Sequence, residues 1–363
     1  MPSSSALFYG GLAVASAAVI HGYATRLPGF TDATELLSTE ACFTQPFARH
    51  LPLPPALDQA ACALASAFRS VQGPGQVLAH ILGALLVPAT TVMVYESLRP
   101  VHSLTGVGTF ARQASIFMLI AQVLGGACYA AFFLAASLST TAGGRVAHNL
   151  AMKEPKPGKA LLRYALPPAP KVWAVLIAVL GYIVPSLPLI GGWGYTSTAI
   201  WQIFPLFVLL LAAVSPPVIS SLFPWTRTDG SRAFAIVALT VIGVIPSVVA
   251  HIQFLFSSPL DAFLLRSQPD PKSLGYAMHV LLLADLVVIA GANASYVLTA
   301  DGGSGPDIRG RFLLFGLLTL VIGPGGALAL MWGYREICLS FAYERISQGD
   351  AVRIEEDTSA IEK

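Results

Sequence analysis

Charged residues are scarce in this chain. Lys, Arg, Asp and Glu make up 11% of its 363 residues, whereas a soluble domain carries about 25%. The net charge is +2 without a long basic block, so we expect no nucleic-acid partner. The four cysteines lack metal or redox spacing, and we expect no metal site. Only Cys42 and Cys62, which share one predicted loop, are placed to form a disulfide, and their pairing is left open.

Motifs of several common enzyme classes are also missing. The chain contains no GxSxG, no HExxH, no Walker loop, no dinucleotide fingerprint and no histidine boxes. Aspartate-rich DDxxD motifs are absent, which argues against prenyl transfer from a magnesium-bound diphosphate. Two kinds of function are left by these exclusions, acid catalysis on an apolar substrate and transport. Neither requires a cofactor.

Long apolar runs are abundant. Hydrophobic residues make up 55% of the chain, and runs of 18 or more residues predict membrane-spanning helices. We therefore expect an all-α polytopic membrane bundle of about eight helices. The expected spans are 6–24, 74–98, 112–138, 171–190, 199–222, 233–256, 273–298 and 311–341. For the first of them, a cleaved signal peptide is the alternative.

The spans and their connections form one predicted domain, residues 1–341. The loop 25–73 includes a stretch able to lie in the membrane interface, and 139–171 is expected to be a basic cytosolic loop. Residues 342–363 are polar and are expected to form a disordered tail.

Asp285 lies near the middle of the apolar run 273–298. An aspartate at the centre of a spanning helix costs about 2.5–3.5 kcal/mol on insertion scales, so it must face a protein or water-filled interior. We expect Asp285, desolvated and without an adjacent cation, to stay protonated. The alternative to a functional role is that Asp285 only joins neighbouring helices through polar contacts.

If the chain crosses the membrane eight times, the second, fourth and sixth connections and the C-terminal tail lie on the same side of the membrane. The helix ends on that side carry Glu96, Arg99, Arg112, Trp201, Gln202, His251, Gln253, Tyr276, His279, Arg335 and Glu336. We therefore expect a cavity whose polar mouth includes Glu96 and whose floor is Asp285. Arg99, three residues beyond Glu96, is placed to hold it ionised.

Further residues are expected to line this cavity. Gln122, Tyr129 and Phe133 share one helical face. The full set of predicted lining residues is Gln122, Tyr129, Phe133, Trp201, Tyr276, His279 and Asn293. Any of them can instead serve helix packing or the aromatic belt, and we expect His21 and His80 to be interior histidines rather than metal ligands.

The pattern resembles the fungal integral-membrane terpene cyclases of meroterpenoid biosynthesis, of the ascochlorin and ascofuranone type. The resemblance rests on size, span count, the long first loop, Glu96 in VYESLRP and Asp285 in LLLADLVV. It implies an isomerase or lyase of the endoplasmic reticulum membrane that needs no cofactor. Its substrate would be a hydrophobic prenylated aromatic small molecule, protonated at an epoxide or alkene. Asp285 would be the acid and Glu96 its partner or the terminal base, or the reverse, with Arg99 in support.

Two other functions fit parts of the pattern. A secondary transporter for a small or amphiphilic solute would also use a midplane carboxylate and proline-broken helices. A membrane receptor or scaffold would use the acidic tail as a partner site.

Overall fold

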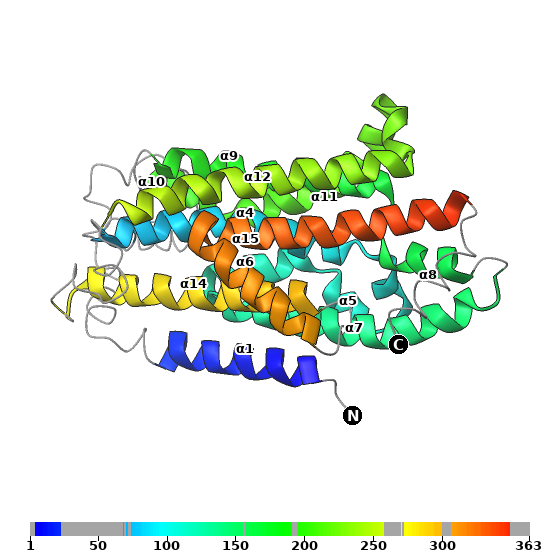
Figure 1. Cartoon of the computed structure of the whole chain (residues 1–363). Helices are drawn as coiled ribbons and strands as arrows, with labels where there is room; N and C mark the ends of the chain where they lie inside the picture. Colours follow the sequence, from blue (N-terminus) through cyan, green and yellow to red (C-terminus); the bar gives the residue numbers. More distant parts are fainter. Residues whose placement is uncertain are drawn as a thin grey trace.

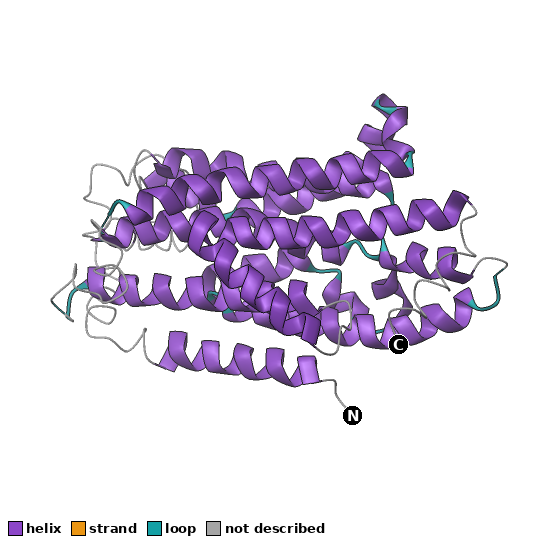
Figure 2. Cartoon of the chain, in the orientation of Figure 1, coloured by secondary structure: helices purple, strands orange, loops and turns teal. Residues whose placement is uncertain are grey.

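The computed structural model describes residues 4–22, 68, 70–71, 74–154, 157–190, 195–257, 270, 272–299 and 306–348. All regular structure in these residues is helical (Figure 2), which confirms the all-α fold. Six of the described helices are long and apolar enough to cross a membrane. The protein is therefore a multi-pass membrane protein, but the expected count of eight spans is wrong.

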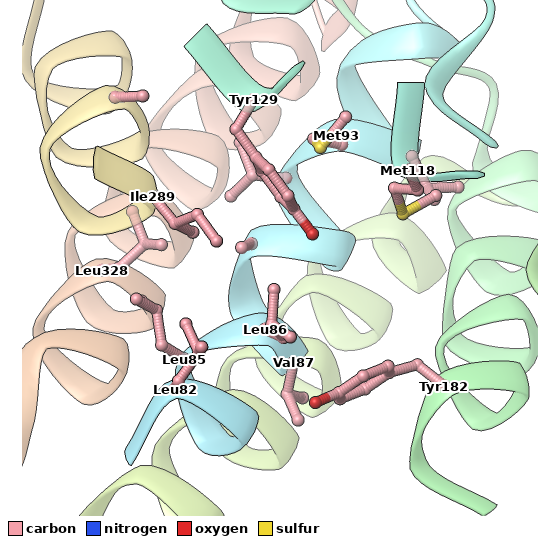
Figure 3. Close-up of a cluster of buried hydrophobic side chains, with 14 of the residues drawn as sticks. Leu82, Leu85, Leu86, Val87, Met93, Met118, Tyr129, Tyr182, Ile289 and Leu328 are labelled. Carbon is pink, nitrogen blue, oxygen red and sulfur yellow. The ribbon is translucent and has the colours of Figure 1, made fainter. Parts of the chain in front are cut away.

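Helix α4 (Pro74–Ser97) occupies the centre of the bundle (Figure 1). It packs against α9 (Ala169–Ile190), α12 (Asp229–Leu255), α14 (Leu274–Thr299) and α15 (Pro306–Gln348). Its sequence is apolar on all sides, as expected for a helix with neighbours all round. Figure 3 shows the rings of Tyr129 and Tyr182, which come from two other helices, pointing toward α4.

The span expected at 112–138 is instead a helical hairpin. Helix α6 (Ala114–Leu124) ends at Gly125, whose φ of 61° suits glycine, and α7 (Ala127–Ala151) then runs back. The return is shown by Ser139 of α7, whose hydroxyl lies 2.9 Å from Nδ1 of His102, just after α4. The chain thus enters and leaves this hairpin at one end of the bundle.

Helix α15 is also broken. Gly323 has φ 78°, and the segments on either side form two arms that meet at an angle (Figure 1). Helix α12 satisfies the freed backbone groups: Ser247 Oγ accepts the N–H of Gly326 at 2.6 Å, and His251 Nε2 donates to Leu320 O at 2.9 Å. The run 311–341 is therefore not one straight span.

The remaining helices complete the bundle. They are α1 (Ser4–Gly22), η3 (Pro100–Leu104), α5 (Gly108–Ala111), α8 (Pro157–Ala165), α10 (Tyr195–Gln202), α11 (Phe204–Leu222) and η4 (Pro224–Arg227). The loop expected at 139–171 is largely helical, because Gly143, Ala147 and Ala151 form a buried stripe that extends α7. Residues 342–348 likewise continue α15, whereas 349–363 and most of 25–73, with Cys42 and Cys62, lie outside the described residues.

Candidate functional site

A cavity of about 770 Å³ opens beside α4. Its walls come from α4, α6, α7, α9, α10, α12 and α14, and most of the lining side chains are apolar or aromatic. Asp285 and three of the predicted lining residues, Gln122, Tyr129 and Trp201, border it, and so do Gln202 and Gln253 of the predicted mouth. The volume lies within the range of about 300–1,000 Å³ that is usual for small-molecule sites.

Asp285 is held against the hairpin turn between α6 and α7. Its Oδ1 accepts the backbone N–H of Gly126 at 2.7 Å, directly before the first residue of α7. The approach is close, because a Cβ on Gly126 would lie 3.0 Å from Val288 of α14. Among the described residues, Asp285 makes no ion pair. One carboxyl oxygen is thus engaged by the start of α7, while the side chain borders the cavity.

One end of the cavity carries polar side chains. His80 Nδ1 lies 3.1 Å from Gln253 Oε1, and both residues border the cavity together with Gln202. Nearby, Trp201 Nε1 donates to Ser186 Oγ at 3.1 Å. These residues belong to α4, α12, α10 and α9, so four helices meet at this end.

Glu96 lies in a different place, within a buried cluster of four charges. Its Oε2 is 2.5 Å from Arg99 Nε and accepts the Tyr296 hydroxyl at 2.9 Å. Its Oε1 accepts from Arg335 Nη2 at 2.7 Å. Arg99 Nη2 also donates to Glu336 Oε1 at 2.6 Å. Two guanidinium groups and two carboxylates therefore balance one another in the interior.

The structure does not bring Glu96 to Asp285. Tyr296, which contacts Glu96, lies eleven residues beyond Asp285 on α14, a rise of about 16 Å. The expected shared mouth is wrong because the α6–α7 hairpin returns to its own side and reverses the direction of α9, α11, α12 and α14. Trp201, Gln202 and Gln253 consequently lie near His80, at the end of α4 opposite Glu96. The break at Gly323 turns the chain again, so the last part of α15 carries Arg335 back to Glu96, on the side expected for it.

The other predicted residues do not border the cavity. Phe133 stacks on Tyr296 with ring centres 4.7 Å apart, and so lies on the side of the charge cluster. Asn293 is buried, and its Nδ2 donates to Ile289 O at 2.9 Å within α14. His279 is buried and Tyr276 is half-buried near the start of α14. Arg99 belongs to the charge cluster, and its Nη1 also donates to Ala165 O of α8.

Tyr182 and His80 are the most informative of the lining residues that the sequence analysis did not predict. Tyr182 donates its hydroxyl to Gly83 O at 2.6 Å and links α9 to α4. A tyrosine amid the apolar run of α9 was the available signal. His80 was expected to be an interior histidine, but only its pairing with Gln253 reveals its place on the cavity wall.

Within the described residues, no three His, Cys, Asp or Glu side chains lie together as metal ligands would. Comparison with protein-family models, curated proteins and solved structures finds no match for this chain.

Proposed function

We propose that this protein is a membrane-bound terpene cyclase that protonates an epoxide or alkene on the prenyl chain of a hydrophobic aromatic substrate. The observation that carries the proposal is the position of Asp285, a carboxyl group that makes no ion pair with any described residue and lies on the wall of a large and mainly apolar cavity. Such a cavity suits an isoprenoid chain, and a carboxyl group is the acid that its activation requires.

Asp285 acts as the general acid. The N–H of Gly126 occupies Oδ1, which leaves Oδ2 as the oxygen that carries and donates the proton. Transfer to an epoxide oxygen breaks a C–O bond and generates a carbocation, which the next double bond of the chain attacks. The remaining carboxylate is stabilised by the Gly126 N–H and by the positive end of the α7 dipole.

The cavity walls suit the cation that follows. Tyr129, Tyr182 and Trp201 border the cavity, and aromatic faces attract positive charge. Apolar residues such as Leu82, Val87 and Ile289 limit the access of water, which would otherwise quench the cation early. Ring closure ends in proton loss or capture by a substrate hydroxyl, so the product is an isomer of the substrate.

Glu96 takes a structural role in this proposal. Three side chains already bind its carboxylate, and its contact with Tyr296 places it well away from Asp285. Asp285 is therefore the residue assigned to the chemistry, whereas Glu96 holds α4, α14 and α15 together. The endoplasmic reticulum membrane, where hydrophobic precursors are accessible, is the compartment that we propose.

The proposal is tested by expression in a yeast that makes candidate prenylated aromatic epoxides. We expect a product of unchanged mass and altered chromatographic retention, absent from cells with the empty vector. A panel of such substrates that yields no isomer, together with substrate-dependent proton flux in proteoliposomes, would instead identify a carrier. That carrier would use the same cavity and the same carboxyl group.

A further inference from the structure

We propose that His80, Gln202 and Gln253 form a subsite for the hydroxyl-bearing head of an otherwise apolar, uncharged ligand. The proposal rests on the proposed function for the identity of that ligand as the substrate. All three residues border the cavity and come from three different helices, α4, α10 and α12. No residue of the subsite carries a fixed charge, so it suits a neutral head group.

The hydrogen-bonding state of these residues defines what the ligand must supply. With Gln253 Oε1 facing Nδ1 of His80 at 3.1 Å, Nδ1 carries the hydrogen and donates it. Nε2 is then an acceptor, and this buried atom has no hydrogen-bond partner among the described residues. Gln202 Oε1 is a second buried acceptor without a partner in the same part of the chain. Buried polar atoms are nearly always satisfied, and a pair of ligand hydroxyl groups would satisfy both.

The subsite and Asp285 lie at different depths. Glu96 of α4 and Tyr296 of α14 are in contact, and both helices run in the same direction. Counting back along them places His80 near the level of Val280 and about 8 Å from the level of Asp285. A ligand whose hydroxyl groups bind at His80 and Gln202 therefore extends its apolar chain toward Asp285. This arrangement would bring a bond in the chain, rather than the head, to the acid.

Ligand binding to the purified protein in nanodiscs tests the subsite without any turnover. The probes are 5-undecylresorcinol and 1-O-dodecylglycerol, each compared with its own dimethyl ether, and the readout is the fluorescence of the tryptophans, including Trp201 in the cavity wall. The measured quantity is the ratio of the two dissociation constants, ether over diol. Comparing this ratio between protein variants cancels the partition of each probe into lipid.

We expect the wild-type ratio to be about tenfold for at least one probe pair, since two hydrogen bonds are at stake. Gln202→Leu and His80→Phe should each lower it about three- to fivefold. Gln113→Leu is the matched control, because Gln113 is exposed and lies outside the cavity; it should leave the ratio unchanged. If one of the two cavity variants does not yield folded protein, the change in the ratio is measured on the other variant.

The outcomes separate the subsite from the cyclase. A preference for the resorcinol indicates an aromatic substrate, and a preference for the glycerol ether indicates a lipid; both support the subsite. Equal binding of diol and ether, or a ratio that both cavity variants leave intact, would overturn it. Asp285→Asn should retain the ratio, because Asp285 lies outside the subsite. A normal ratio in a wild-type protein that converts no substrate would refute the cyclase and leave the subsite standing.

Discussion

Removal of the Glu96 side chain should destabilise the protein strongly. In Glu96→Ala, the two buried guanidinium groups of Arg99 and Arg335 face only one carboxylate, that of Glu336. Loss of one partner from a buried ion pair costs about 3–5 kcal/mol, because the charge left behind is neither solvated nor paired. At about 2 °C per kcal/mol, the melting temperature should fall by roughly 6–10 °C.

The assay is thermal unfolding of the purified protein in detergent. Glu154→Ala is the matched control, because Glu154 pairs with Arg163 at 2.8 Å but their side chains are 37% and 57% exposed. An exposed pair contributes at most about 1 kcal/mol, so this variant should melt within about 2 °C of wild type. A Glu96→Ala protein that melts no lower than Glu154→Ala would refute the reasoning.

A double variant examines the same cluster further. Arg335→Ala combined with Glu96→Ala removes one charge of each sign, and the Arg99–Glu336 pair remains. We expect the double variant to lose at least about 1 kcal/mol less than the two single variants together. Strict additivity would show that the four charges do not act as a unit.

Three further predictions concern stability, each read from melting temperatures. Burial lowers the pKa of His102 to about 4 from 6.5; the unfolded chain therefore binds the proton first, and stability falls as the pH drops from about 6.5 to 4. His102→Asn should flatten this dependence, and parallel curves would contradict the assignment. Gly143→Ala should cost about 1–3 kcal/mol, because its Cβ would lie 2.6 Å from Val101 O. The neighbouring Gly144→Ala, with no atom within 4 Å, should be neutral or stabilising; equal losses would argue against this packing. Ser247→Ala should cost about 1–3 kcal/mol because the Gly326 N–H loses its acceptor; an unchanged melting temperature would show that this cap is dispensable.

The long apolar runs allowed much of the fold to be predicted. Helices α4, α9, α12 and α14 match expected spans closely, because each is an apolar run without a break in the chain direction. The hydropathy of a segment does not show whether the chain crosses the bundle once within it or turns back. The run 112–138 is apolar throughout, yet Gly125 and Gly126 reverse the chain within it. This unrecognised reversal inverted the direction of α9, α11, α12 and α14, and only the second break, at Gly323, returned the end of α15 to its expected side.

The candidate site, too, was predictable from the sequence only in part. Asp285 was predicted to border a cavity, because a lone carboxyl group in an apolar run must face an interior, and the structure places it there. Arg335, the partner of Glu96 on α15, is 239 residues away in sequence, and Glu336, the partner of Arg99, is 237 residues away. The expected side of the helix ends did group Glu96, Arg99, Arg335 and Glu336, but as part of a cavity mouth and not as a buried ion-pair cluster. Helical periodicity relates only residues of one helix, so neither this pairing nor the contact between His80 and Gln253 could be derived from it.

The central claim is that Asp285 donates the proton that starts cyclisation. The most direct measurement compares the rate of isomer formation by wild type and Asp285→Asn in the same yeast membranes, at matched protein amounts. Asparagine keeps the size and can accept the Gly126 N–H, but it has no acidic proton. We expect the rate to fall at least about 100-fold, the usual contribution of a general acid. An Asp285→Asn protein that forms the isomer at the wild-type rate would contradict the claim.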